Sequence, residues 1–214
     1  MQNTTLYLIR HSIKYDIKDI VENYNTSDSE QIKNEKLILS IEGERRAEIL
    51  SNEKELQNID IVYASVLVRT LETAKYLLEK QNLKIEESDE LCEMYFGIYD
   101  GWKWEDVNKI QPEIKQTQNE INEIVGIPGQ ESMEETAKRM YNYIFKIVKE
   151  NEGKTILISS HGVAIEAFLR KIENIKFRYE REKFCQYNVA INELEFKNDK
   201  FKIIRLADIN YLNK

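Results

Sequence analysis

Residues 6–12 read LYLIRHS and residues 156–162 read ILISSHG. Each stretch is a short apolar run typical of a buried strand, and a histidine follows it directly. These residues, His11 and His161, are the only two histidines of the chain. Ligands of open α/β sheets bind at the carboxyl ends of the strands, so histidines at two strand ends can meet in one crevice. The pair therefore indicates an active site, with phosphate chemistry as the first hypothesis. The alternative is two ordinary half-buried histidines at strand termini.

Apolar patterns along the chain predict alternating strands and helices. Buried strands are expected at 4–9, 61–64 and 155–159. Apolar residues at three- and four-residue steps predict helices at about 40–50, 67–78, 132–149 and 163–171. The last part of the chain, 187–206, alternates apolar and polar residues around a turn and is expected to form a hairpin. Strand followed by helix, repeated, implies an α/β fold: a three-layer α/β/α sandwich with a mostly parallel sheet.

Two segments, 14–36 and 108–130, have no clear hydrophobic period. Long irregular segments inside a compact domain are usually lids, binding loops or insertions. We therefore expect a single domain over residues 1–214 with irregular insertions at these two places. Both are expected to cover the strand ends, and the first to influence the choice of substrate.

The composition is that of a globular, acidic protein. Its 214 residues are 42% hydrophobic and 32% charged, enough apolar material for one good core. The formal net charge of −7 disfavours nucleic acid or an anionic membrane surface as a partner. No run approaches the ~20 apolar residues of a membrane span, and the N-terminus does not read as a signal peptide. We expect a cytoplasmic protein, and the sequence leaves its oligomeric state open, with a homodimer as one option.

The sequence does not suggest a metal site or a bound cofactor. Two histidines without a clustered carboxylate motif do not make a convincing metal site. The two cysteines, Cys92 and Cys185, lack metal-ligand spacing and are too few for a disulfide framework, so we read them as free thiols.

Two arginines lie at positions where an unpaired positive charge is unfavourable and where a bound anion would offset it. Arg10 immediately precedes His11 at a strand end, and burying an unpaired guanidinium there would be costly. Arg69 lies in the expected first turn of a helix, after Ser65, a candidate helix cap; a basic residue there opposes the helix dipole. A bound phosphate would account for both, and ion pairs with Asp or Glu are the alternative.

These pieces resemble the histidine phosphatase superfamily, also called the phosphoglycerate mutase-like family. The Arg-His-Gly motif of that family reads Arg10-His11-Ser12 here, and its late Ser-His-Gly reads Ser160-His161-Gly162. Other matches are Ser65, Arg69, Glu72, Thr73 and Ala74 for one motif, and Leu91, Glu93, Gly97, Asp100 and Gly101 for another. Smaller matches include Leu39-Ser40-x-x-Gly43, Gly129-x-Glu131-Ser132 and Asn188.

The resemblance implies a mechanism and assigns the site residues. His11 would be the nucleophile that forms a phosphohistidine, and Arg10, Arg69 and His161 would surround the transferring phosphoryl group. Glu93 would protonate the leaving oxygen and later activate water. Ser12 and Gly162 are expected to contact substrate as well, with no metal and no cofactor. The activity implied is that of a histidine acid phosphatase-type phosphomonoester hydrolase acting on a small phosphorylated metabolite.

The sequence also departs from the family pattern. Ser12 replaces the usual glycine, and residues 13–17 replace a Glu-Thr-x-x-Asn segment, so altered phosphate contacts are expected there. Two other functions remain open. A phosphoglycerate mutase-type phosphotransferase is less favoured because such enzymes tend to be longer after the region of Glu93. A non-catalytic module that binds phosphate ligands is disfavoured because both histidines, both arginines and Glu93 are present.

Overall fold

A mixed six-stranded sheet forms the centre of the protein in the computed structural model, which describes residues 3–16, 30–121, 127–176 and 181–213. The strands lie in the order β3-β2-β4-β1-β5-β6. The first four are parallel, β5 runs antiparallel to β1, and β6 runs antiparallel to β5. Their bounds are β1 Thr4–Arg10, β2 Ile61–Ala64, β3 Ile85–Glu87, β4 Thr155–Ser160, β5 Ile191–Lys197 and β6 Lys200–Asp208. The predicted mostly parallel sheet and the terminal hairpin are confirmed.

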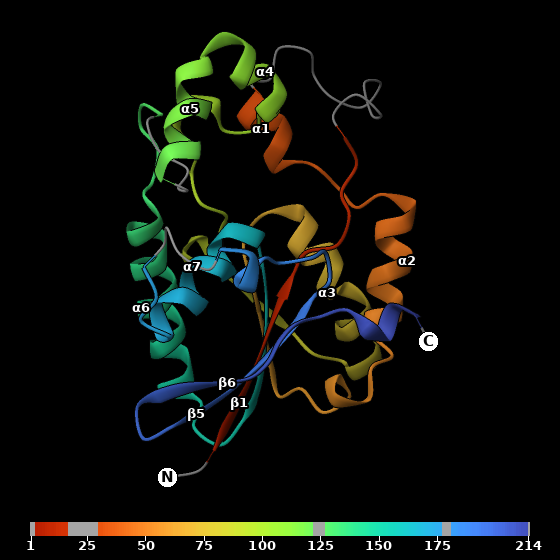
Figure 1. The fold of residues 1–214 in the computed structure, drawn as a ribbon. Coiled ribbons are helices and arrows are strands. Elements are labelled where there is room, and N and C mark those ends of the chain that lie inside the picture. Colours follow the sequence, from red (N-terminus) through yellow and green to blue (C-terminus); the bar gives the residue numbers. More distant parts are fainter. Residues whose placement is uncertain (1–2, 17–29, 122–126, 177–180, 214) are drawn as a thin grey trace.

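Helices cover both faces of this sheet (Figure 1). Their bounds are α1 Glu30–Glu35, α2 Ile41–Leu50, α3 Val68–Gln81, α4 Trp104–Ile110, α5 Pro112–Ile121, α6 Met133–Glu150 and α7 Gly162–Ile172. Short 3₁₀ turns lie at Lys54–Leu56, Asp89–Leu91, Gly97–Tyr99, Arg181–Phe184 and Asn210–Asn213. Within the described residues, no helix is both long and apolar enough to cross a bilayer.

Alternating side chains of β1 divide the core into two halves. Leu6 and Leu8 pack in the cluster that includes residues of α6 and α7, whereas Tyr7 and Ile9 pack in the cluster of α2 and α3. Because successive strand residues point to opposite faces, one strand supplies both halves of the core. The predicted three-layer α/β/α arrangement is confirmed.

Local sequence signals set the ends of several elements. Ser40 caps α2 by accepting a hydrogen bond from the Gly43 amide, and Ser132 forms a capping box with Glu135 at the start of α6. The β5–β6 turn places Asn198 and Asp199 at positive φ, as a tight hairpin requires. The expected start of a helix near residue 40, the expected start of the long helix near residue 132 and the hairpin turn are confirmed.

Other expectations need correction. The segment 108–130 is expected to be irregular, but its described part contains the end of α4 and all of α5. Ile114 and Ile127 of this segment pack with Val107 in a small apolar cluster. Within 14–36 the helix α1 was not expected, and residues 17–29 lie outside the described part. The strand β3 was also missed, because three residues carry too little pattern to read.

The connections place two strand ends at one crevice. Arg10 pairs with Ser160 across β1 and β4, and the His11 amide donates to the Ser160 carbonyl at 2.9 Å. The next long helix after β1 is α2, whereas β4 leads into α7 on the opposite face, so this is a switch point of the sheet, where ligands of such folds bind. Figure 1 shows α1, α4 and α5 grouped at the end toward which β1 points.

Candidate active site

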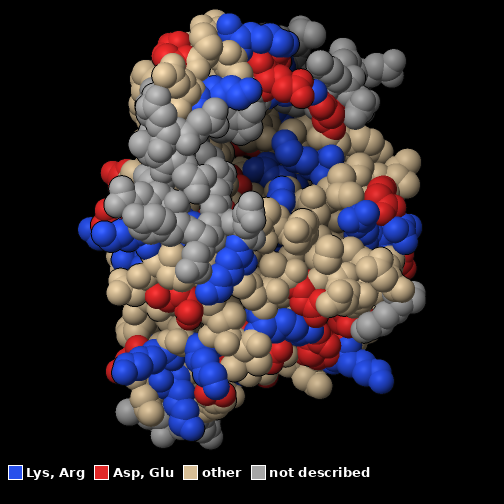
Figure 2. Space-filling view, viewed as in Figure 1, with Lys and Arg blue, Asp and Glu red and all other residues tan. Residues whose placement is uncertain are grey.

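A cavity of about 190 Å³ opens at the carboxyl end of β1. Figure 2 shows Lys and Arg side chains gathered in a hollow of the molecule, below the end formed by α4 and α5. The cavity is lined by residues from distant parts of the chain: Arg10, His11, Lys14, Asn34, Arg69, Glu93, Phe96, Tyr99, Asp100, Gly101, Trp102 and Val107. Four of the residues predicted from sequence to form the site, Arg10, His11, Arg69 and Glu93, therefore line one cavity.

His11 is held with one nitrogen free. Its Nδ1 lies 2.7 Å from the Ser12 carbonyl oxygen, which can only accept, so Nδ1 carries the proton. Burial and the guanidinium groups of Arg69 and Arg10 lower the pKa of His11 well below its usual value. The ring is therefore neutral near pH 7, and its Nε2 carries a lone pair that can attack an electrophile.

The second histidine lies beside the first. The rings of His11 and His161 meet edge to face with centroids 5.2 Å apart. His161 Nε2 lies 2.7 Å from the Ser65 hydroxyl, while its Nδ1 is buried without a hydrogen-bond partner among the described residues. Burial and Arg69 lower the pKa of His161 well below its usual value, so it too is neutral. When Ser65 donates to Nε2, the proton of His161 lies on Nδ1.

Ser65 thus has a different role from the one expected. The residue before α3 in the cap position is Leu67, with no side-chain cap, and Ser65 instead bonds His161 and Thr70. The expectation that Ser65 caps this helix is wrong. The β2 strand ends one residue earlier, which directs the Ser65 hydroxyl toward the neighbouring end of β4.

Both arginines keep unpaired N–H groups at the site. Arg10 Nη1 donates to the Gln186 carbonyl at 2.6 Å, and Arg69 Nη1 donates to the Asn34 carbonyl at 2.9 Å. The Nε of each is buried and has no hydrogen-bond partner within the described part of the chain. Such orphaned donors are costly unless an acceptor occupies the site. Together with His161 Nδ1 they suit an anion.

Glu93 reaches this cavity from an irregular segment. Its Oε1 accepts from the amides of Ala164 at 2.9 Å and Met94 at 3.0 Å, and its Oε2 from Val163 at 3.3 Å. Two of these amides belong to the first turn of α7, whose free N–H groups favour a carboxylate. The residue is half-buried.

Lys14 and Asp100 add a second pair of charged residues to the cavity lining. Lys14 Nζ donates to Asn34 Oδ1 at 2.9 Å, and burial together with Arg69 lowers the pKa of Lys14 to about 8. Asp100 is half-buried, and burial raises the pKa of its carboxyl group. The cavity is therefore lined by two arginines, a lysine and two acidic residues, Glu93 and Asp100.

Three residues expected to bind substrate lie outside the cavity lining: Ser12, Gly162 and the fully buried His161. The Ser12 side chain is fully buried, its hydroxyl donates to the Gly43 carbonyl at 2.7 Å, and its amide donates to Thr73 Oγ1 at 2.9 Å. Gly162 is also absent from the lining; a Cβ there would lie 3.3 Å from Arg10 Nε, so its small size leaves room for that guanidinium. The expected substrate contact of Ser12 is therefore not supported, because its polar groups are occupied.

Several lining residues escaped the sequence reasoning. Asn34 and Val107 come from segments with no chemical motif, and Phe96 is an apolar residue between Glu93 and Gly97. Lys14, Tyr99 and Trp102 also line the cavity, whereas Tyr15 and Tyr95 do not. Among the described residues, no group of three or more His, Cys, Asp or Glu could hold a metal ion.

The fold and the site define an α/β protein with a buried histidine pair, one member of which, His11, lines a cavity together with two arginines. Residues 6–209 match the model of the histidine phosphatase superfamily, branch 1, and the chain belongs to this family.

The protein is similar to characterised and solved members of this group. It is 29% identical over 129 residues to phosphoserine phosphatase 1 of Hydrogenobacter thermophilus, a match that spans 60% of this chain and 61% of that one. Its fold matches the structure of Bacillus stearothermophilus YhfR, with a TM-score of 0.83, 20% identity and coverage of 98% and 99% of the two chains. It also matches a phosphoserine phosphatase mutant of Entamoeba histolytica in complex with phosphoserine, with a TM-score of 0.75, 21% identity and coverage of 98% and 99%.

Proposed function

We propose that the protein is a metal-independent phosphatase that hydrolyses a small phosphomonoester through a phosphohistidine at His11. One observation carries this proposal: Arg10, Arg69 and Glu93 line one cavity with His11, a histidine whose Nε2 is free. Phosphoryl transfer depends mainly on positioning and on stabilising charge on the phosphoryl oxygens, which the two guanidinium groups supply. The family match and the name of the Hydrogenobacter relative support an enzyme of the phosphatase or phosphotransferase class.

In the first step, Nε2 of neutral His11 attacks phosphorus while the bond from phosphorus to the ester oxygen breaks. Arg10, Arg69 and His161 donate to the phosphoryl oxygens, and Glu93 passes a proton from the bound phosphate monoanion to the leaving alkoxide. In the second step, ionised Glu93 takes a proton from water, which attacks the phosphohistidine and breaks the nitrogen–phosphorus bond. Inorganic phosphate leaves, and His11 and Glu93 return to their starting states.

Lys14 supports a narrower substrate class, phosphomonoesters with a second anionic group such as a carboxylate. Its ammonium has three donors and uses one on Asn34 Oδ1, so it can also bind a ligand oxygen. The cavity of about 190 Å³ is below the usual range of drug-sized sites, which favours a small metabolite. Phosphoserine, which the Entamoeba protein binds, combines these features and is the first substrate to test.

The proposal is tested by phosphate release from p-nitrophenyl phosphate, phosphoserine and 3-phosphoglycerate, with a chelator present. The parent and His11→Ala are compared after circular dichroism has shown that both are folded. We expect turnover by the parent, unchanged by chelator, and its loss in His11→Ala. No turnover of any ester by the folded parent, or loss of turnover on chelation, would overturn the proposal; transfer of phosphate between glycerate oxygens instead of release would favour the mutase alternative.

A further inference from the structure

The segment that carries Glu93 has little regular structure of its own. It follows the 3₁₀ turn Asp89–Leu91, and residues 92–95 belong to no helix or strand. A catalytic acid must be held within a fraction of an ångström of its working position, which such a segment cannot ensure by itself.

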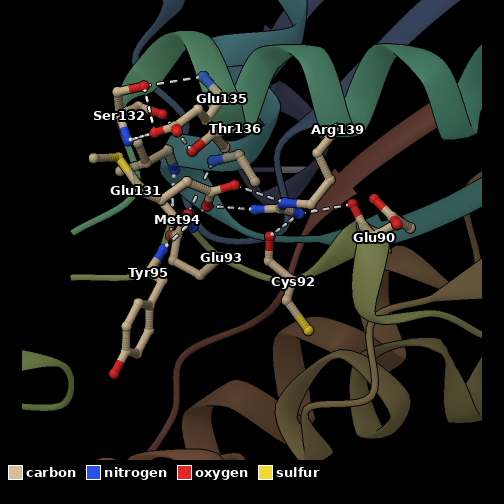
Figure 3. A network of polar contacts seen from close by, with 12 residues as sticks. Glu90, Cys92, Glu93, Met94, Tyr95, Glu131, Ser132, Glu135, Thr136 and Arg139 are labelled. Atoms are coloured by element: carbon tan, nitrogen blue, oxygen red, sulfur yellow. Dashed lines mark hydrogen bonds and ion pairs between the residues drawn. The ribbon is translucent and has the colours of Figure 1, made fainter. Parts of the chain in front are cut away.

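The ion pair of Arg139 and Glu131 contacts the backbone of this segment before and after Glu93 (Figure 3). Arg139 of α6 donates from Nε and Nη2 to the two carboxylate oxygens of Glu131, at 2.9 and 2.8 Å. Its remaining nitrogen, Nη1, donates to the carbonyls of Glu90 at 2.7 Å and Cys92 at 3.1 Å. One guanidinium therefore binds the backbone just before Glu93.

Glu131 fixes the backbone just after Glu93. Its Oε2 accepts from the Tyr95 amide at 3.3 Å, and its own amide donates to the Tyr95 carbonyl at 2.9 Å. The side chains of Glu131 and Arg139 are only 18% and 20% exposed, so solvent screens the pair less than it would a surface pair. Burial raises the pKa of Glu131, but Arg139 outweighs it and holds that pKa below the usual value, so the pair stays ionised near neutral pH.

Hydrogen bonds also fix the start of α6, the helix that carries Arg139. The capping box of Ser132 and Glu135 sets the first turn of the helix, one residue after Glu131. Arg139 lies two turns further along and cannot shift without moving this turn. Figure 3 shows α6 presenting Arg139 and the capping box to the segment of Glu90 to Tyr95.

We propose that Arg139 and Glu131 are positioning residues that hold Glu93 at the oxygen it protonates. This inference rests on the proposed function, because it takes Glu93 as the general acid. Neither Arg139 nor Glu131 lines the cavity, so both act through the segment between them.

Comparing the activity toward two esters with different leaving groups distinguishes loss of this positioning role from a general loss of structure. An alkoxide, as in phosphoserine, needs a proton to leave, whereas p-nitrophenolate leaves without one. Arg139→Lys keeps the charge but loses the planar fork that binds both Glu131 and the two carbonyls. We expect it to lower kcat/KM for phosphoserine about 10- to 100-fold and kcat/KM for p-nitrophenyl phosphate less than about threefold, because kcat/KM reports the step in which the leaving group departs, whereas the activation of water by Glu93 is common to both esters.

The matched control is Arg205→Lys. Arg205 is 28% exposed, pairs with Glu55 at 2.7 Å and Asp208 at 3.2 Å, and lies on the edge strand β6. It should lose comparable stability with no change in the ratio of the two kcat/KM values. Introducing Arg139→Lys into Glu93→Gln should lower kcat/KM for phosphoserine by less than about twofold more, because the acid is already absent.

Amide hydrogen exchange at residues 90–96 completes the test. Faster exchange at the Tyr95 amide in Arg139→Lys, but not in Arg205→Lys, is expected. Equal losses for both esters, additivity with Glu93→Gln, or unchanged exchange would overturn the inference. Inactivity of the folded parent toward both esters would instead overturn the proposed function and with it the role of the pair in proton transfer, and the exchange result would still decide whether the pair holds the segment.

Discussion

Replacing Lys14 with methionine is expected to remove the preference for substrates that carry a carboxylate. Lys14 lines the cavity wall, with Asn34 as its hydrogen-bond partner and its remaining donors available to a ligand. Methionine has a similar length and packs in the same space but cannot donate a hydrogen bond. The test therefore removes a charge with little change in volume.

The size of the effect follows from one charge-assisted hydrogen bond in a half-buried place. Such bonds contribute about 1.5–3 kcal/mol, which corresponds to roughly a 10- to 150-fold change in kcat/KM. Phosphoserine and phosphoethanolamine differ by one carboxylate, so the pair of substrates isolates this bond. We expect Lys14→Met to lower kcat/KM by that factor for phosphoserine and by less than about threefold for phosphoethanolamine.

The same bond gives a pH signature. With a pKa of about 8, the charged fraction of Lys14 falls from about 0.9 at pH 7 to about 0.1 at pH 9. The ratio of kcat/KM for phosphoserine to that for phosphoethanolamine should fall about tenfold over this range in the parent and stay flat in Lys14→Met. Taking the ratio cancels the titration of the phosphate and amine groups that both substrates share.

The control is Lys103→Met, which removes a neighbouring lysine already paired with Asp16. It should leave the substrate ratio and its pH dependence unchanged. The reasoning is refuted if Lys14→Met affects both substrates equally, or if the ratio in the parent does not change between pH 7 and pH 9.

Three further predictions concern the frame of the site. Ser65→Ala removes the hydroxyl that fixes His161 and should lower kcat for p-nitrophenyl phosphate about 10- to 100-fold with little change in KM, whereas an unchanged kcat would show that His161 is oriented without it. Gly43→Ala would place a Cβ 1.9 Å from the Ile13 carbonyl oxygen, and urea unfolding should show a loss of at least about 2 kcal/mol; a loss below 0.5 kcal/mol would contradict this close contact. Because the folded pKa of Lys14 lies below the usual 10.5, its charge opposes folding at pH 7. Lys14→Met should therefore raise the free energy of unfolding at pH 7 by about 1–3 kcal/mol. This gain should disappear as the pH rises from about 8 to 10.5. An equal gain at pH 7 and at about pH 10.5 would refute the prediction.

The sequence predicted that the two histidines follow strands, because a buried strand has a strong apolar pattern, and repeated strand and helix imply a mostly parallel sheet. Arg10 and Arg69 could be named for the same reason, since a charge at a buried strand end or in the first turn of a helix conflicts with its surroundings. These conflicts between local pattern and residue type mark the site.

The missed features depend on contacts between distant segments. The helix α5 has a weak apolar pattern, and its one clear signal, Pro112 in the first helical position, was not used. The hydrogen bonds of Ser12 to Gly43 and Thr73 join three segments of the chain, so only the folded structure could show that this serine is occupied.

Trapping the phosphorylated intermediate tests the central claim most directly. The parent is mixed with p-nitrophenyl phosphate, quenched within milliseconds at alkaline pH, where phosphohistidine survives, and digested for mass spectrometry. The account predicts a phosphoryl group on His11, absent in His11→Ala and accumulating in Glu93→Gln, in which water is activated slowly. A phosphoryl group on Ser12 or on His161, or hydrolysis by the parent with no covalent intermediate, would contradict it.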